Sequence, residues 1–314
     1  MASSSKPVME MEVESTPKPN WLELPRDLTT NILPRLDSFE ILTTARNVCP
    51  YWWNICKDSR MWRTIHMSDI HMLRCDSSNL LKICCYAVDK SCGLLEDIYI
   101  KYFGSDDLLK YVADRASNLR CLKIEECLRS TSKEGFCEAV KKLPLLEELV
   151  ISNCHFLYRV SFDIIGQHCP LLKSLILHYG SFDARQTCDQ QAFDVARTMS
   201  GLRHLKLLNN NLTNDGLLAI LDGCPLLESL DLRGCFHLDL SGSIGKRCKQ
   251  QVKNLCLPTD FMDVSNNTCD DPFLVSLQLH RICSDLFEGY DFSHLGPDDL
   301  DLSDDLDFSD DLDF

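Results

Sequence analysis

Apolar residues recur in the order Leu-x-x-Leu-x-Leu between residues 95 and 257 of the chain. Clear copies begin at Leu119, Leu146, Leu172, Leu202, Leu227 and Val252, and a looser copy begins at Leu95. Successive copies begin 24 to 30 residues apart. The alternation of apolar and polar positions within each copy predicts a short strand with one buried face. The intervening segments favour helices, because residues such as Leu217, Ile220 and Leu221 recur there at helical spacing.

A strand pattern that repeats at this period is typical of a leucine-rich-repeat solenoid. A single repeat cannot bury its apolar face alone, whereas stacked repeats form one continuous core. The sequence therefore predicts an α/β solenoid, a horseshoe of about seven leucine-rich repeats. Proline cannot continue a helix, so helices are expected to end at Leu143-Pro144, Cys169-Pro170 and Cys224-Pro225.

Several cysteines follow the same period. Eight residues after the first position of a copy lie Cys127, Cys154 and Cys235, and Asn210 takes this place in its own copy. At this position of the repeat a small polar side chain bonds to buried backbone, so we interpret these cysteines as structural thiols. A zinc site is disfavoured because the chain has no Cys-x-x-Cys pair.

The bulk composition narrows the class of protein. Residues 1–20 have no apolar segment of the kind found in signal peptides, so the 18 cysteines are interpreted as free thiols in the nucleus or the cytoplasm. No stretch of 18 uncharged apolar residues is present, so no membrane span is predicted. The net charge is −15, and residues 291–314 contribute −10 of it through ten Asp with no Lys or Arg. The mildly acidic remainder argues against nucleic-acid binding.

The chain is predicted to have four parts. Residues 1–19 and the acidic tail, residues 291–314, are expected to be disordered, because small polar residues or dense like charge prevent a packed core. Residues 20–67 hold all four Trp and form a compact N-terminal module, and residues 68–290 hold the repeats and their cap. The long fourth copy carries a polar insertion at 181–191, which we expect to contribute to recognition.

The N-terminal module is predicted to contain three short helices. The first is expected to end at Pro34, and the second to run from an N-cap at Asp37 to Pro50. The apolar positions of the three helices are Leu28, Ile32 and Leu33, then Ile41 and Ala45, then Trp52, Trp53 and Ile55. A module of this size needs a neighbour for stability. From the pattern alone it is either a cap on the solenoid or a docking module.

The module resembles an F-box. The resemblance covers residues 21 to about 66 and is carried by Leu24-Pro25-x-x-Leu28-x-x-x-Ile32-Leu33-x-x-Leu36, Ile41-Leu42, Val48-Cys49-x-x-Trp52-x-x-Ile55 and Met61-Trp62. The sequence departs from the F-box pattern at Pro34 and Pro50. Together with the repeats, the ordered chain resembles the plant-type F-box/leucine-rich-repeat proteins.

This resemblance implies a substrate-recognition subunit of an SCF-type (Skp–cullin–F-box) E3 ubiquitin ligase. Such a subunit holds a target protein close to the ubiquitin-transfer machinery and catalyses nothing itself. The implied partners are a Skp-family adaptor, cullin through that adaptor, and an unknown target. The expected adaptor contacts are Leu24, Pro25, Ile32, Leu33, Leu36, Val48 and Trp52.

Target binding is expected on the concave face of the repeats, where the polar strand positions point. The candidate residues are Lys123, Glu125, Ser152, His178, His204, Lys206, Asp231 and Arg233. The histidines are interpreted as contact residues, because no catalytic or metal-binding motif accompanies them, and no cofactor is expected. A repeat scaffold without ligase function is the alternative, and an enzyme is a third, distant one.

Overall fold

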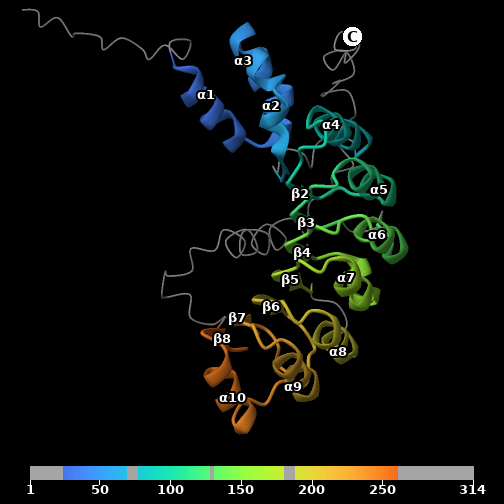
Figure 1. The fold of residues 1–314 in the computed structure, drawn as a ribbon, viewed down its shortest axis with the longest axis vertical. Coiled ribbons are helices and arrows are strands. Elements are labelled where there is room, and N and C mark those ends of the chain that lie inside the picture. Colours follow the sequence, from blue (N-terminus) through green and yellow to red (C-terminus); the bar gives the residue numbers. More distant parts are fainter. Residues whose placement is uncertain (1–23, 69–76, 128–130, 180–187, 261–314) are drawn as a thin grey trace, which may run out of the picture.

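The structure is a computed structural model that describes residues 24–68, 77–127, 131–179 and 188–260. Figure 1 shows a helical module at one end of a curved array of strand–helix units. The predicted disordered segments, residues 1–19 and 291–314, and most of the polar insertion at 181–191 lie outside the described residues. In the described part of the chain, no helix has both the length and the apolar character needed to cross a membrane.

The N-terminal module contains three α-helices and short 3-10 segments. Its elements are α1 (Arg26–Ile32), η2 (Leu33–Arg35), α2 (Ser38–Thr43), η3 (Ala45–Asn47), α3 (Pro50–Cys56) and η4 (Ser59–Arg63). The predicted N-cap is confirmed, because the Asp37 carboxylate accepts a hydrogen bond from the backbone N–H of Phe39 at 2.9 Å. The prediction that Pro50 ends the second helix is wrong. Pro50 is instead the first residue of α3, where a proline leaves no hydrogen bond unmade.

Eight parallel strands form one sheet whose strand order follows the sequence. The strands are β1 (Thr64–Met67), β2 (Asp97–Lys101), β3 (Cys121–Glu125), β4 (Glu148–Ser152), β5 (Ser174–His178), β6 (His204–Leu208), β7 (Ser229–Asp231) and β8 (Asn254–Cys256). Strands β2 to β8 are the seven predicted copies, so the solenoid prediction is confirmed. The sequence pattern missed β1, which lies directly after the N-terminal module and starts the sheet.

Helices line the outer side of this sheet, as the repeat period predicts (Figure 1). They are α4 (Ser77–Lys90), α5 (Asp106–Arg115), α6 (Lys133–Val140), α7 (Phe162–His168), α8 (Asp189–Thr198), α9 (Asn214–Gly223) and α10 (Ser243–Gln251), with a 3-10 segment η6 (His155–Arg159) before α7. The expected helix ends at Cys169 and Cys224 are confirmed, because these residues are the C-caps of α7 and α9.

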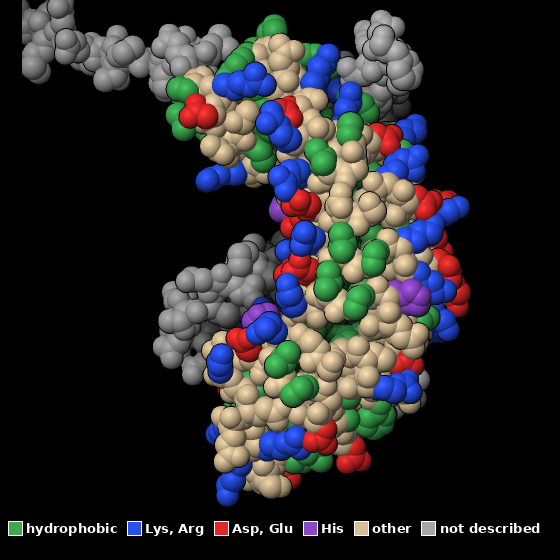
Figure 2. All heavy atoms as spheres, in the orientation of Figure 1, with side chains coloured by type: hydrophobic (Ala, Val, Ile, Leu, Met, Phe, Trp, Pro, Cys, Tyr) green, Lys and Arg blue, Asp and Glu red, His purple; other side chains and the backbone are tan. Residues whose placement is uncertain are grey.

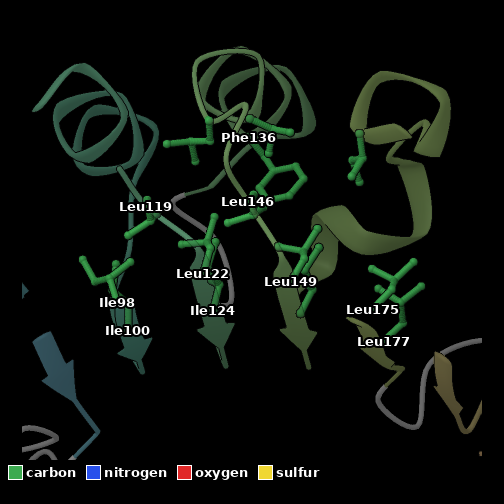
Figure 3. Packing of buried hydrophobic residues seen from close by; sticks show 14 of the residues in the cluster. Ile98, Ile100, Leu119, Leu122, Ile124, Phe136, Leu146, Leu149, Leu175 and Leu177 are labelled. Carbon is green, nitrogen blue, oxygen red and sulfur yellow. The ribbon is translucent and has the colours of Figure 1, made fainter. Parts of the chain in front are cut away.

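The core is a pair of apolar ladders that run from strand to strand. The parallel register places equivalent positions side by side. The second strand position is Ile98, Leu122, Leu149, Leu175 and Leu205, and the fourth is Ile100, Ile124, Ile151, Leu177 and Leu207. Figure 3 shows the middle of these ladders pointing toward the helices. Burial of each such side chain stabilises the fold by about 1.5–3 kcal/mol, so the ladders hold the units together.

Neighbouring helices are also joined by a polar clamp that occurs twice. Asp106 at the start of α5 accepts hydrogen bonds from the backbone N–H and the hydroxyl of Ser132, both at 2.7 Å. Asp189 at the start of α8 binds Thr213 in the same way, at 2.9 and 2.7 Å. Ser132 and Thr213 are the N-caps of α6 and α9. Hydrogen bonds to a carboxylate are worth about 1.5–3 kcal/mol each, so the clamps fix the stagger of consecutive helices.

The periodic cysteines have the structural role expected of them. The thiol of Cys127 donates to the carbonyl of Phe103 at 2.7 Å, and the thiol of Cys235 donates to the carbonyl of Leu207 at 2.9 Å. In each case the acceptor belongs to the preceding repeat. Cys154 makes the equivalent contact with the carbonyl of Ile124 at 3.7 Å. These thiols therefore bond to buried backbone carbonyls in or just after the strand of the preceding repeat.

We expect the fold to lose stability at alkaline pH because of its buried thiols. Burial raises the pKa of Cys235 and Cys169 to about 12 and that of Cys224 to about 11. A thiol in the unfolded chain ionises near pH 8.5. The free energy of unfolding is therefore unaffected by these thiols below that pH, and it falls as the pH rises toward 12, because only the unfolded chain can then ionise them easily. The urea midpoint should decline steadily above pH 9, and less steeply in a Cys169→Ala/Cys224→Ala variant. An equally steep decline in the variant would contradict this origin.

Gly223 is required by close contact between two helices. A Cβ atom at Gly223 would lie 2.2 Å from the carbonyl oxygen of Ala196 and 2.5 Å from its Cα atom. Because this obstacle is backbone, we expect Gly223→Ala to destabilise the protein by about 1–3 kcal/mol in urea titrations, despite the better helix propensity of alanine. Gly201 is the matched control, since nothing lies within 4 Å of its Cβ position. Gly201→Ala should leave the urea midpoint almost unchanged, and equal effects of the two changes would refute the contact argument.

Candidate functional sites: the exposed face of α1 and the concave sheet

The first helix has two apolar sides. Leu33 is fully buried just beyond its end, and Thr29, one turn earlier, is buried as well. Leu28 and Ile32 lie on the other side and are 47% and 40% exposed. A surface helix normally carries polar residues opposite its buried stripe. One face of α1 therefore packs into the core of the module, and a second, apolar face is exposed.

Val48 is a further exposed apolar residue, on a second segment of the module. It follows η3 and is 55% exposed, the largest fraction of the apolar residues in the described module. Figure 2 shows hydrophobic side chains at the surface of the module over α1. We refer to Leu28, Ile32 and Val48 as the exposed apolar face. Scattered exposed leucines are ordinary in proteins, whereas apolar groups collected on one small module indicate an interaction site.

The predicted adaptor contacts differ in their exposure to solvent. Ile32 and Val48 are exposed and Pro25 is exposed beside them, whereas Leu24, Leu36 and Trp52 are half-buried. Leu33 belongs to the hydrophobic core with no exposed surface. It is therefore removed from the candidate contacts, because its side chain fills the module interior. Leu28 was missing from the predicted contacts, and the signal that could have found it is its spacing of four residues from Ile32.

A different face of the module holds it on the repeats. Helix α2 packs against β1 and α4. The hydroxyl of Ser38 accepts a hydrogen bond from the backbone N–H of His66 at 3.0 Å, and the carboxylate of Asp37 accepts one from the N–H of Ser68 at 2.7 Å. Trp62 is buried nearby, and its indole N–H donates to the carbonyl of Cys56 at 2.8 Å. The module therefore covers the end of the sheet with α2 while α1 keeps its own apolar face, so cap and docking module are compatible roles.

All eight predicted target-binding residues occupy the concave side of the sheet or its edge. The third strand position carries Lys123, Lys206 and Asp231, and the fifth carries Glu125, Ser152 and His178. His204 begins β6, and Arg233 follows β7. Figure 2 shows acidic, basic and histidine side chains interspersed along this side of the molecule.

The fifth strand position is enclosed by the turn that follows it. Tyr102, Glu126, Asn153 and Asn209 come directly after a fifth position, and all have positive φ angles. Their backbone N–H groups donate to carbonyls of the next repeat, as from Glu126 to Ser152 at 2.9 Å. Left-handed backbone is uncommon for Tyr and Glu. The turns thus continue the ladder of backbone hydrogen bonds and bury the side chains just before them.

A buried charged cluster forms at the fifth position of β2 and β3. The Tyr99 hydroxyl donates to the Glu125 carboxylate at 2.7 Å, and the Lys101 ammonium lies 3.8 Å from Glu125 and 3.6 Å from Glu126. Glu125 is only 3% exposed. Burial raises its pKa, and the hydrogen bond from Tyr99 and the charge of Lys101 only partly offset this. Glu125 is therefore held by its own neighbours, which corrects the prediction that it is an open contact residue.

Three further predicted contacts are buried in similar pairs. Ser152 Oγ lies 3.1 Å from His178 Nδ1, and His178 Nε2 lies 3.0 Å from Asn209 Nδ2. The amide of Asn209 is a donor, so His178 accepts at Nε2 and carries its proton on Nδ1, which points to Ser152. The Asp231 carboxylate is held by the Arg233 guanidinium at 2.9 Å. Ser152, His178 and Asp231 are therefore buried on the concave side of the sheet. Arg233 is held by Asp231 and its side chain is only 12% exposed, so the accessible candidates are Lys123, His204 and Lys206.

The described residues offer little support for chemistry other than binding. Among them, no group of three His, Cys, Asp or Glu side chains is placed to hold a metal ion. A hollow of about 340 Å³ lies beside η6 and α8. Its lining includes Tyr158, Asp163 and Asp194, but no cysteine or serine there pairs with a histidine.

Comparison with known proteins agrees with the geometry. Residues 21–68 match the F-box-like family. The chain is 46% identical to F-box protein SKIP19 of Arabidopsis thaliana over 92% of its own length and 94% of that protein. It is 42% identical to F-box/LRR-repeat protein 22 of the same plant, over 85% of each chain, and 29% identical to F-box protein SKIP1, over 72% of this chain and 84% of that protein. The chain therefore belongs to the F-box/leucine-rich-repeat proteins of the Arabidopsis type.

Proposed function

We propose that this protein is the substrate-recognition subunit of an SCF-type E3 ubiquitin ligase. In this proposal residues 20–67 dock on a Skp-family adaptor, and through it on cullin, and residues 68–290 present the target-binding face. The protein catalyses no step itself. It raises the local concentration of target lysines near the charged ubiquitin-conjugating enzyme. Such a subunit works in the nucleus, the cytoplasm or both.

The single observation that carries the proposal is the exposed apolar face. Leu28, Ile32 and Val48 all lie on a module whose core is completed by other residues, so the packing of the described residues does not account for their exposure. Apolar residues gathered on a helix face are the usual anchors of a helix-in-groove or helix-on-helix interface. The F-box match over residues 21–68 supports a Skp-family adaptor as the partner.

The prolines that set this module apart from the F-box pattern fit the same proposal. Pro50 opens α3, and Pro34 lies in the short 3-10 segment after α1. Neither proline interrupts an α-helix, and Ile32 keeps its place in α1 ahead of Pro34. The two prolines therefore give no support to the alternative, a repeat scaffold that no longer binds an adaptor.

For the target, we propose the concave face from β3 to β7. Its accessible polar residues are Lys123, which pairs with the Glu148 carboxylate at 3.2 Å, His204 and Lys206, and its floor contains the half-buried Ile176. A face of mixed charge with an apolar middle suits a folded or extended protein segment with both apolar and polar side chains. Nothing in this face has the phosphate-binding pattern of clustered basic residues that nucleic-acid recognition uses.

The adaptor half of the proposal is tested by co-purification with a Skp-family adaptor. The intact chain should co-elute with the adaptor, and a Leu24→Ala/Pro25→Ala variant should lose much of this binding. Both residues precede α1, and Pro25 supplies the carbonyl that accepts from the Thr29 N–H at 3.1 Å. Because alanine keeps that carbonyl, the change removes side-chain contacts and preserves the helix. A folded, intact chain that does not bind any Skp-family adaptor would overturn the proposal.

A further inference from the structure

The solenoid exposes leucines at one repeated position. Leu94, Leu171 and Leu226 are 41%, 44% and 50% exposed, and each directly precedes the buried first leucine of its copy. Leu145 has the same place in its copy and is half-buried. All four lie in turns that lead from an outer helix into the next strand. Exposed apolar residues scattered singly are ordinary, whereas leucines that share one edge of a solenoid indicate an interaction surface.

A row of charged residues runs beside these leucines. The residue after the first position of each copy is charged in all seven copies, and from β2 to β8 the row is Glu96, Arg120, Glu147, Lys173, Arg203, Glu228 and Lys253. Figure 2 shows acidic and basic side chains alternating along the inner edge of the solenoid, with hydrophobic side chains beside them. We call this row, together with the residue two positions before each member, the strand-start rim. The second set is Leu94, Asn118, Leu145, Leu171, Gly201, Leu226 and Gln251.

The charges of the strand-start rim are paired within the chain but remain open to solvent. Glu147 binds Arg120 and, at 2.5 Å, Lys173, and the side chains of these two basic residues are 53% and 52% exposed. None of the fourteen rim residues, two from each of seven copies, is buried. A carboxylate accepts from several donors and a guanidinium donates to several acceptors, so each group can bind a second partner. A surface that fits the rim therefore has alternating charge at the strand spacing of about 4.8 Å.

The rim of a second copy has this pattern. From β2 to β8 the signs of the charged row are −, +, −, +, +, −, +. A two-fold axis that runs through β5 from the concave to the convex side reverses this order, so that every charge except that on β5 faces its opposite. The facing pairs are Glu96 with Lys253, Arg120 with Glu228, and Glu147 with Arg203, and each pair occurs twice. We propose that two copies of this chain associate through their strand-start rims about this axis, in an isologous interface.

The uncharged positions fit the same axis. Leu171 lies on the axis and meets the same residue of the other copy. Leu145 faces Gly201 of the other copy, and nothing in the single chain lies within 4 Å of the Cβ position of Gly201, so the leucine has room there. Lys173 forms the one like-charged pair, and Glu147 of its own chain neutralises each of the two ammonium groups at 2.5 Å.

The charges also select one register. A slip by one strand that faces β5 with β6 would also face β4 with β7 and β3 with β8, and all three pairs would then have like charge. A slip in the other direction faces β4 with β5, β3 with β6 and β2 with β7, and the last two of these pairs have like charge. Like charges in contact weaken association and suppress wrong arrangements. The order of signs along the rim therefore specifies the axis through β5.

The size of the rim and the position of the axis predict the properties of the dimer. Fourteen residues per copy are fewer than the roughly 20–30 of a standard interface, so we expect a reversible dimer with a micromolar dissociation constant. Because β2 faces β8, the N-terminal module lies beyond β8 of the other copy and its exposed apolar face remains free. Both concave faces open on the same side, so a target with two recognised segments would bind with increased avidity. This last consequence rests on the proposed function, whereas the dimer does not.

Sedimentation velocity of the intact purified chain tests the association. The mean mass should rise from that of a monomer to that of a dimer as the concentration increases through the micromolar range. Leu171→Lys should weaken the dimer at least about ten-fold, because it adds two like charges at the axis beside Lys173. Phe193→Lys is the matched control, since Phe193 on α8 is 43% exposed and lies outside the rim. It should dimerise as the parent does, and circular dichroism confirms that both variants are folded.

Two charge reversals test the two-fold pairing itself. In homodimers, Arg203→Glu would face Glu147 and Glu147→Arg would face Arg203, so each variant alone should sediment as a monomer at concentrations where the parent is dimeric. In a mixture of the two variants, both contacts again join opposite charges. The mixture should therefore recover the dimer, and a folding defect in either variant could not be rescued in this way.

Every other outcome overturns the proposal. A parent chain that remains monomeric at all concentrations would show that the rims do not associate. A dimer that Leu171→Lys leaves intact, or that Phe193→Lys weakens equally, would not use the rim. A mixture of Arg203→Glu and Glu147→Arg chains that stays monomeric would exclude the axis through β5. No adaptor or target is present, so failure here is distinct from failure of the ligase proposal.

Discussion

Ile32→Glu should weaken binding to a Skp-family adaptor at least about 100-fold, which corresponds to about 2.7 kcal/mol. Ile32 is 40% exposed in the free protein and is the last residue of α1, one turn after the exposed Leu28. A glutamate there remains solvated in the free chain but must lose its water in an apolar interface, where no basic partner is provided for it. Central apolar contacts of this kind carry most of the affinity of an interface.

The change should leave the fold intact, because the Ile32 side chain is not a member of the hydrophobic core. Adaptor affinity is measured by titration calorimetry, and folding by circular dichroism and urea unfolding of the same samples. Asn31→Glu is the matched control, since Asn31 is exposed on the same helix and outside the apolar face. It should bind almost as the parent does. Equal losses for the two variants would show that charge near α1, and not the apolar face, governs binding.

Much of this architecture could be predicted from the sequence, because the solenoid repeats one simple rule. Leucines that recur at fixed positions report directly on a ladder such as Leu122, Leu149 and Leu175, where every repeat presents the same environment. The structural role of the periodic thiols could also be predicted, because Cys127 and Cys235 occupy the same position of the repeat. The pattern failed at β1, because a four-residue strand whose apolar residues are Ile65 and Met67 carries no leucine signature.

The candidate sites were less predictable, because exposure depends on neighbours that are distant in sequence. Leu33 and Ile32 are adjacent and equally apolar, yet one fills the core and the other faces outward. Glu125 looks like an open contact residue by strand alternation alone. Its burial comes from Tyr99 and Lys101 in the previous repeat and from the left-handed turn after the strand. Sequence patterns identify the face of a strand but not what packs beside each side chain.

Pro50 is a position where the sequence pattern gave the wrong helix boundary. Proline is unfavourable inside a helix but favourable at the first helical position. A sequence reading must therefore choose between ending one helix and starting another. The structure ends α2 at Thr43, inserts a 3-10 segment, and begins α3 at Pro50, with the Cys49 thiol accepting from the N–H of Trp52 at 3.5 Å. Helix α3 packs against η3 and η4, and the local sequence around Pro50 does not reveal these contacts.

Phe136→Ala should destabilise the protein by about 3–5 kcal/mol. Phe136 lies on α6 and has no exposed surface. Its ring contacts that of Phe156 in the next repeat, with the centroids 5.0 Å apart, and Figure 3 shows it directed toward Leu146 at the strand side of the core. Removing the ring leaves a cavity at the junction of two repeats, between buried side chains of α6, η6 and the strands. Because each repeat of a solenoid is stabilised by its neighbours, the loss should extend to the backbone of β3 and β4.

Urea unfolding measures the total loss, and amide hydrogen exchange locates it. Exchange should accelerate most in β3 and β4 and least in β7 and β8, which lie three or more strands away. Phe193→Ala is the matched control, because Phe193 on α8 is the same residue type but 43% exposed. It should cost less than about 1 kcal/mol, since little buried surface is removed. If both variants unfolded at the same urea concentration, burial between repeats could not be the main source of stability. Uniform acceleration of exchange along the whole sheet would instead mean that the solenoid unfolds as one cooperative unit and not repeat by repeat.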